Sequence, residues 1–104
     1  MASAEASDVI KRRPKSTAHT LRLYVAGNAP NSLRAIANAK AICEGQGGVP
    51  YELEIVNVLE HPKRALADGI IVTPTLLKLS PPPIQRMVGD LSDRAQVLLT
   101  LGNK

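Results

Sequence analysis

The sequence is poor in aromatic residues: Tyr24 and Tyr51 are the only two, and there is no Trp or Phe. Proteins that bind single-stranded nucleic acid stack the bases on aromatic side chains, and RNA-recognition sheets rely on the same contact. The formal net charge is only +4, which favours solubility and weak attraction of anions over a nucleic-acid groove. We therefore expect no nucleic-acid partner.

Cysteine and long hydrophobic runs are also scarce. Cys43 is the only cysteine, so the chain cannot form an internal disulfide. No apolar run approaches the roughly 20 residues that cross a bilayer, and no secretory segment precedes the domain. These absences lead us to expect a cytoplasmic protein that makes no membrane contact.

Residue clusters with the spacing of a metal or catalytic site are missing as well. The two histidines, His19 and His61, have no obvious co-ligand at metal-ligand spacing. The chain has neither a glycine-rich phosphate loop nor a Ser/His/Asp set. The sequence therefore predicts no metal, no cofactor and no catalytic residue.

The length of 104 residues, with 44% hydrophobic and 21% charged residues, fits one small domain. Residues 1–19 are rich in Ala, Ser, Lys and Arg without strand or helix periodicity, which predicts a disordered basic arm. The basic cluster at residues 11–15 could contact nucleic acid or acidic lipid, but short basic tails are usually just solvated. We assign the single folded domain to residues 20–104.

The first half of that domain has the pattern of a βαβ unit. Leucine and valine alternate with polar residues over 20–26, which predicts a strand. Asn31 or Ser32 can cap a helix that runs to Glu44 with one apolar stripe and ends at the following glycines. A second alternating strand is expected over 51–59, parallel to the first, with a right-handed crossover.

The second half is less regular. Pro62 can begin a short helix that Gly69 ends. Residues 76–79 and 84–88 form a plausible β-hairpin around the turn at 80–83. Asp90 or Ser92 can cap a last helix through Leu101, but the continuous apolar run at 97–101 would serve equally as a buried strand, and periodicity alone does not decide.

This order of elements resembles the thioredoxin family. In that family a redox cysteine pair lies between the first strand and the first helix, where the helix N-terminus lowers the thiol pKa. The corresponding loop here, residues 27–32, contains no cysteine. Cys43 lies on the apolar stripe of the helix, so we expect it to be a packed core residue.

The amino-acid sequences of several segments resemble a narrower family more closely than they resemble thioredoxins in general. Between residues 20 and 101 the chain resembles the bacterial circadian-clock protein KaiB in Leu23-Tyr24-Val25-Ala26-Gly27-Asn28, Pro30-Asn31-Ser32, Thr73-Pro74-Thr75-Leu76, Pro81-Pro82-Pro83 and Val88-Gly89-Asp90-Leu91-Ser92. The resemblance implies a non-catalytic protein that binds the clock ATPase KaiC and modulates its phosphorylation cycle. It also implies an α/β, thioredoxin-like βαβ-α-ββα fold, and an alternative fold of the second half that assembles as a homo-oligomer, a tetramer or a dimer.

The resemblance further suggests which residues bind the partner. Arg34 and Lys78 keep the basic character of the family's binding surface, although ordinary solvated charges are an equally weighted interpretation. Glu52 and Glu54 stand where clock members tend to have a small residue and a lysine, so the local charge is reversed. Pro74 is expected to follow a cis peptide bond in the thioredoxin-like fold and so to mark which fold is present.

Other functions remain open. A KaiB-like stress-response adaptor without a rhythmic role would tolerate the charge reversal. A thioredoxin-like oxidoreductase or transferase needs a nucleophile or glutathione site that the loop after the first strand does not show. The sensor domain of a histidine kinase also resembles KaiB, but nothing of a kinase follows Leu101. The chain lacks the longer terminal helix and acidic tail of clock members, so we expect the thioredoxin-like arrangement.

Overall fold

The computed structural model describes residues 19–44 and 51–101, which form a four-stranded sheet and three helices. The expected βαβ-α-ββα order is confirmed by β1 (His19–Val25), α2 (Pro30–Glu44), β2 (Tyr51–Asn57), α3 (Pro62–Ala67), β3 (Thr75–Ser80), β4 (Gln85–Val88) and α4 (Arg94–Leu101). The predicted basic arm and the glycines after Glu44 lie outside the described residues. His19 is the exception, because it begins β1 and does not belong to the arm.

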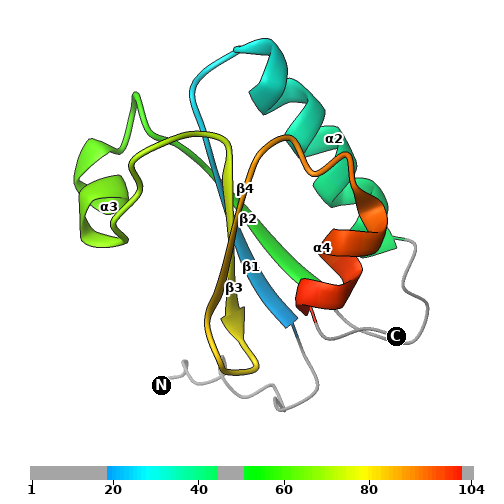
Figure 1. Cartoon of the computed structure of the whole chain (residues 1–104). Helices are drawn as coiled ribbons and strands as arrows, with labels where there is room; N and C mark the ends of the chain where they lie inside the picture. The colour runs from blue at the N-terminus through cyan, green and yellow to red at the C-terminus, as the bar shows by residue number, and fades with distance from the viewer. Residues whose placement is uncertain (1–18, 45–50, 102–104) are drawn as a thin grey trace, which may run out of the picture.

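The strands follow the order β2-β1-β3-β4, so β1 and β3 are central and β2 and β4 are edges (Figure 1). β1 and β2 are parallel, as the βαβ interpretation predicted, with Leu23 opposite Ile55. β3 is antiparallel to β1, and the predicted hairpin of β3 and β4 is confirmed with Leu76 opposite Met87. The two halves of the chain therefore meet along β1 and β3.

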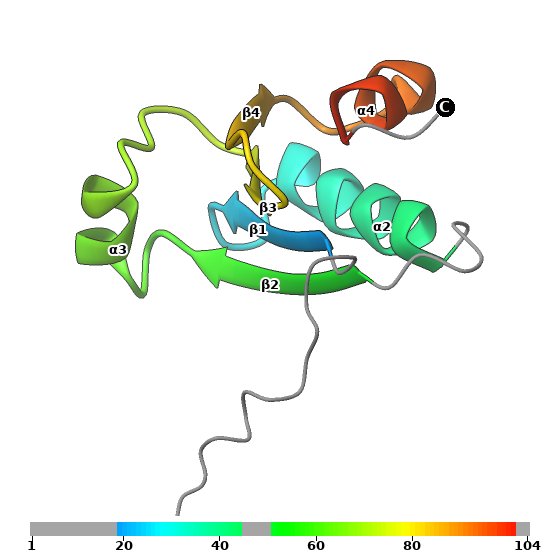
Figure 2. The ribbon, with the colours of Figure 1, turned by 90° about the horizontal axis from the view of Figure 1, so that it is seen from below.

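The helices lie on opposite faces of the sheet. α2 and α4 cover one face, while α3 lies beyond the opposite face near one end (Figure 2). The larger apolar cluster fills the space under α2 and α4, with Leu21, Leu23, Val25, Ala35, Ala39, Ile42, Leu76, Leu91, Val97 and Leu101 buried. A smaller cluster under α3 contains Tyr24, Val56, Ala65 and Leu77. Side chains of neighbouring strand residues alternate between these two clusters.

α2 begins at Pro30, one residue before the first of its two expected cap residues. Pro30 is its first residue, a position at which the missing N–H and fixed φ of proline fit a helix. Asn31 and Ser32 therefore lie inside the helix, and the capping prediction is wrong. The Ser32 hydroxyl instead accepts a hydrogen bond from the Ala26 N–H at 3.0 Å, so it fixes the loop that leads into the helix. The predicted apolar stripe is confirmed by buried Ala35, Ala39 and Ile42.

β2 ends at Asn57, two residues before the predicted end of the strand. The Asn57 side-chain oxygen accepts hydrogen bonds from the N–H groups of Gly27 and Leu59, each at 3.0 Å. Gly27 has φ of +55°, a conformation that favours glycine, and an added Cβ would lie 3.3 Å from Leu59. A single amide therefore joins the loop after β1 to the loop after β2.

Residues 97–101 are helical, which resolves the ambiguity of the apolar run. Val97 and Leu101 are buried one turn apart, whereas Leu99 between them is 68% exposed, as one face of a helix requires. Asp93 caps α4 by accepting the Gln96 N–H at 3.1 Å. The predicted caps Asp90 and Ser92 are wrong, because Asp90 accepts the Ser92 N–H in the preceding turn. Leu91 adopts φ of 66° in that turn.

Candidate functional site

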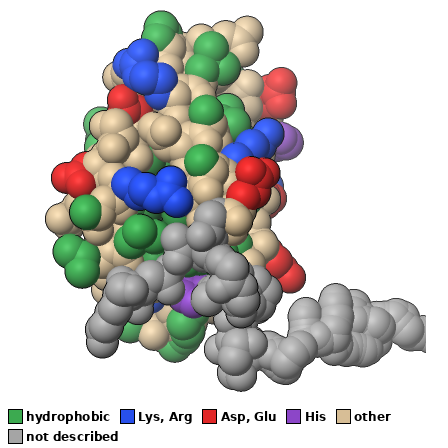
Figure 3. Space-filling model, turned by 90° about the vertical axis from the view of Figure 1, so that its right-hand side faces the viewer, with side chains coloured by type: hydrophobic (Ala, Val, Ile, Leu, Met, Phe, Trp, Pro, Cys, Tyr) green, Lys and Arg blue, Asp and Glu red, His purple; other side chains and the backbone are tan. Residues whose placement is uncertain are grey.

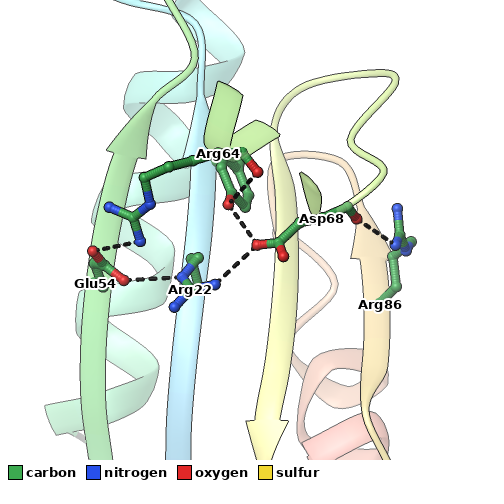
Figure 4. Close-up of polar contacts among 6 residues, drawn as sticks. Arg22, Glu54, Arg64, Asp68 and Arg86 are labelled. Atoms are coloured by element: carbon green, nitrogen blue, oxygen red, sulfur yellow. Dashed lines mark hydrogen bonds and ion pairs between the residues drawn. The ribbon is translucent and has the colours of Figure 1, made fainter. Parts of the chain in front are cut away.

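A cluster of charged side chains lies on the sheet face that α3 partly covers (Figure 4). It joins β1, β2, β4 and the α3 segment, and we call it the polar cluster: Arg22, Tyr24, Glu54, Arg64, Asp68 and Arg86. Arg22 and Tyr24 alternate with the leucines of β1 that face α2 and α4, so strand periodicity alone directs them to this side.

Tyr24 is the most buried member of the polar cluster, and it contacts Asp68. The Tyr24 hydroxyl lies 2.5 Å from Asp68 Oδ2 and 3.2 Å from the carbonyl oxygen of Arg64. Burial, followed by the Asp68 hydrogen bond, raises the pKa of Tyr24. The same hydrogen bond is the main reason that the pKa of Asp68 is lowered, with Arg22 as a further cause. Tyr24 therefore stays a proton donor and Asp68 a charged acceptor at neutral pH.

Glu54 lies between two arginines. Its Oε1 is 2.9 Å from Arg22 Nε, and its Oε2 is 2.8 Å from Arg64 Nη2. The hydrogen bond from Arg22 and then that from Arg64 lower the pKa of Glu54. The predicted reversal of charge at this position is thus compensated within the molecule. Glu52, two residues earlier on the same face, is exposed and makes no ion pair with a described residue.

Arg86 completes the polar cluster from the opposite edge strand. Its guanidinium donates to the carbonyl oxygens of Gly69 at 2.9 Å and Asp68 at 3.0 Å. These carbonyls follow the last turn of α3, where helix C-termini attract cations. The cluster therefore positions α3 against three strands, and all its arginines have partners inside the molecule.

Arg34 is exposed on α2, as predicted, but it is not a free charge. Its Nε lies 3.1 Å from Asp90 Oδ2, and its Nη2 contacts the Asn31 side-chain oxygen. Asn38 donates to the Asp90 carbonyl at 2.8 Å. The Ser92 and Arg34 hydrogen bonds lower the pKa of Asp90. These contacts hold the turn after β4 against α2.

Lys78 is buried and is not the solvated charge that one interpretation of the sequence predicted. It is 6% exposed, and it lies on the face under α2 and α4 because it alternates with Leu77 and pairs with Leu21. Burial and then the nearby Lys78 charge lower the pKa of His19. The Nδ1 of His19 is buried and has no hydrogen-bond partner among the described residues, while its ring lies 4.9 Å from that of Tyr51.

The predicted partner-binding residues are therefore not brought together. Arg34 lies near the carboxyl end of β1, and Lys78 lies toward its amino end on the helix-covered face. Glu52 and Glu54 belong to the opposite face. A surface made of all four residues does not exist in this fold.

Four exposed apolar side chains belong to the segments that follow β1 and β2 or precede β3, a feature that the sequence analysis missed. Tyr24 pairs with Thr75, so the loop after β1 and the segment before β3 emerge side by side. Ile71 is 92% exposed, Leu59 71%, Leu33 50% and Val72 48%. We call these four residues the apolar rim. The predicted cis peptide bond before Pro74 lies at this end and is confirmed.

The loop between β1 and α2 offers no group for thiol chemistry, since it consists of residues 26–29 without Cys. Cys43 lies on the apolar stripe near the end of α2, half-buried against the larger cluster, as predicted. Burial raises the pKa of the Cys43 thiol, with Glu44 as a lesser cause. Its position and pKa favour a packing role.

The described surface shows no large patch of one charge on the face drawn in Figure 3, where basic and acidic side chains are interspersed. In residues 19–44 and 51–101, no group of three or more His, Cys, Asp or Glu side chains could hold a metal ion. None of the helices in these ranges is long and apolar enough to cross a membrane.

Comparison with known sequences finds one family over most of the chain. A family model described as KaiB domain matches residues 22–103. The circadian clock oscillator protein KaiB of Prochlorococcus marinus (strain MIT 9313) is 49% identical over 88 residues, 85% of this chain and 73% of that protein. The circadian clock protein KaiB3 of Synechocystis sp. (strain ATCC 27184 / PCC 6803 / Kazusa) is 52% identical over 81 residues, 78% of this chain and 79% of that protein.

Solved structures share the arrangement of helices and strands. The N-terminal domain of Synechococcus elongatus SasA has a TM-score of 0.70 at 27% identity, covering 88% of this chain and 90% of that one. Chloroplastic thioredoxin z has a TM-score of 0.68 at 22% identity, covering 97% and 88%. The second likeness shows a thioredoxin-like fold and nothing about activity.

Proposed function

The chain belongs to the KaiB family, and we propose that it is a non-catalytic regulatory protein that binds a KaiC-like ATPase and modulates the phosphorylation cycle of that ATPase. The observation that carries this proposal is the match of the KaiB family model over residues 22–103. The named relatives are clock proteins, and their identity to this chain is close to one half.

A binding role also agrees with the chemistry of the loop after β1. In thioredoxin-like enzymes this loop carries the nucleophile, whose activity depends on a lowered thiol pKa. Here residues 26–29 contain no thiol, and Cys43 lies at the other end of α2 with a raised pKa. The fold is retained without the group that its redox chemistry needs.

We place the partner surface at the apolar rim and the adjacent exposed face of α2. Exposed apolar side chains that gather at one end of a small protein are typical of interaction sites. Ile71 and Val72 supply the apolar area and Arg34 a nearby charge. Lys78 is too buried to contribute a direct contact, so its role as a partner-binding residue is not retained.

Size-exclusion chromatography of this chain, mixed with the KaiC relative from the same genome and ATP, tests the proposal. We expect co-elution, and we expect Ile71→Asp to weaken the complex at least tenfold because a carboxylate would be buried against the partner. Arg34→Glu should weaken it through charge reversal. Asp90→Asn removes the internal pair of Arg34 while leaving Arg34 in place, so it separates loss of that pair from loss of a partner contact.

The outcomes distinguish surface from function. Co-elution that Ile71→Asp and Arg34→Glu leave unchanged would contradict the placed surface but keep the proposed function. No complex with any such ATPase would contradict the function and favour the stress-response adaptor, a role for which exposed Glu52 would select a different partner. The elution volume of the free chain would also report whether it forms the oligomer that the family resemblance suggests.

A further inference from the structure

Residues 58–72, which we call the α3 arm, have little apolar attachment to the rest of the fold. They comprise α3 with the loops on either side, and Figure 1 shows α3 set apart from α2 and α4. Ala65 is the one buried residue of the α3 arm. Of its other apolar side chains, Leu66 and Ile71 are 78% and 92% exposed, while Val58 and Ile70 pack against the smaller cluster and are partly buried. Apolar burial alone therefore holds this segment weakly.

Polar contacts to three strands supply the rest of the attachment. Within the polar cluster, Glu54 on β2 forms an ion pair with Arg64 of the α3 arm. Arg22 on β1 forms a second ion pair, in which its Nη1 lies 2.9 Å from Asp68 Oδ2. Arg86 holds two carbonyls of the arm from β4. Figure 4 shows these contacts spread over the sheet face. Bonds between charged groups at partly exposed positions are screened by salt, whereas apolar burial is not.

Both ends of the α3 arm are fixed to the sheet independently of the polar cluster. The Val58 N–H donates to the Val25 carbonyl at 2.8 Å, and the Thr75 hydroxyl donates to the Val72 carbonyl at 2.7 Å. The strand pairings involve no residue between these two points. Movement of the arm about its ends therefore leaves the sheet intact.

We propose that the α3 arm opens from the sheet as a unit while the four-strand pairing persists, and that the Glu54–Arg64 and Arg22–Asp68 pairs set the opening equilibrium. Opening uncovers the apolar floor formed by Tyr24, Val56 and Leu77, which is buried in the closed state. The polar cluster is then a salt-sensitive clamp over an apolar surface. This behaviour belongs to the free chain and goes beyond the proposed binding of an ATPase.

Amide hydrogen exchange of the full ¹⁵N-labelled chain, followed by NMR, tests the proposal. Four amides report opening, because their hydrogen bonds lie within the α3 arm and a helix of six residues is not stable in water once it leaves the sheet: those of Ala65, Asp68, Gly69 and Ile70. We expect Asp68→Asn to accelerate their exchange roughly tenfold, since hydrogen bonds to a charged group exceed neutral ones. Glu54→Gln should accelerate the exchange of these amides by roughly threefold, because the ion pairs of Glu54 are partly exposed.

Glu52→Gln is the matched control, because Glu52 lies on the same strand and face without an ion pair to a described residue. It should leave the four amides unchanged. Raising the salt concentration should accelerate their exchange in the parent chain and much less in a Glu54→Gln, Asp68→Asn double variant.

Three results would overturn the proposal. One is equal exchange of the four amides in Asp68→Asn, Glu54→Gln and Glu52→Gln. Another is acceleration of the β1 amides to the same degree, since exchange would then report global unfolding and not a separate opening. The third is absence of protection in the parent chain, because a clamp that never closes sets no equilibrium. None of these readouts requires a partner, so they do not bear on the proposed function.

Discussion

The two faces of the central sheet are stabilised by different kinds of interaction. Under α2 and α4 the strands present Leu21, Leu23, Val25 and Leu76 to a continuous aliphatic core. Under α3 they present a smaller apolar cluster joined to three arginines and two carboxylates. Apolar burial is strong and non-directional, whereas the ionic contacts require particular distances and weaken in salt. The face under α2 and α4 therefore provides stability that depends little on salt, whereas the contacts on the α3 face respond to solution conditions.

We expect the largest loss of stability from a substitution on the apolar face of the sheet. Leu23 is completely buried between the sheet and α2, so Leu23→Ala should lower the free energy of unfolding by about 3 kcal/mol through lost burial and a cavity. Leu66→Ala, at a position 78% exposed on α3, should change it by less than about 0.5 kcal/mol. Urea denaturation followed by circular dichroism measures both. Equal losses in the two variants would contradict the division between the faces.

Tyr24→Phe tests the polar face with a smaller change. The variant keeps the ring but removes the hydroxyl 2.5 Å from Asp68, and it should lower the free energy of unfolding by about 2 kcal/mol. Because that hydrogen bond is the main cause of the lowered pKa of Asp68, the Asp68 pKa should rise in the variant. NMR titration of the carboxylate measures the pKa. An unchanged Asp68 pKa would show that Arg22 alone determines it.

Lys78→Met sharpens the comparison, because Lys78 is the charged residue buried on the apolar face. Replacing the ammonium by an apolar side chain of similar length should stabilise the fold by about 1 kcal/mol. The melting temperature should then rise by roughly 4–8 °C for a domain of this size. The pKa of His19 should also rise, since the Lys78 charge helps to lower it. A fall in melting temperature would mean that Lys78 makes a stabilising contact.

The smallest expected effect is the pH dependence from His19. Its pKa is lowered in the folded state, so the unfolded chain binds the proton first as the pH falls below the ordinary value of 6.5. Stability should therefore decrease from pH 7 downward until the pH is below the folded-state pKa. In the His19→Gln variant the free energy of unfolding should not change with pH over this range, as measured by urea denaturation at several pH values. An identical slope in the parent and the variant would contradict the assignment.

Further acidification acts on the polar face. Glu54 and Asp68 have pKa values lowered by their hydrogen bonds, so the folded state releases these protons more readily than the unfolded chain. The stability that they contribute is present above their ordinary pKa values and is lost as the pH falls through the folded-state values. The α3 side of the sheet should consequently loosen in acid before the aliphatic core does.

Local periodicity made the first half of the fold predictable, and long-range side-chain contacts limited what could be predicted of the rest. The alternation of Leu21 and Leu23 and the helical stripe of α2 identified the βαβ unit directly. The ends of α2 and β2 were displaced because Ser32 and Asn57 bind backbone groups in other loops, and no local pattern reports such bonds. The apolar run at 97–101 suited helix and strand equally, and in the fold it is a helix whose Val97 and Leu101 pack into the larger apolar cluster.

The candidate site was less predictable for a similar reason. Arg34 was correctly expected to be exposed, but its pairing with Asp90 depends on how the turn after β4 meets α2. The contact of Arg22 with Asp68 spans 46 residues and depends on where the segment after α3 meets the sheet. Lys78 is different, because strand alternation with Leu76 already carried the signal that it faces the helices.

The central position of β1 has a consequence for how the protein is made. Its parallel partner β2 follows soon in the chain, but its other partner β3 follows only after α3 and ends at Ser80. A growing chain that has released residues 19–57 from the ribosome can form the βαβ unit, yet one edge of β1 still has no partner. Until β3 emerges, that edge is a site at which another nascent chain can add a strand, so the order of translation itself sets an interval of risk for aggregation.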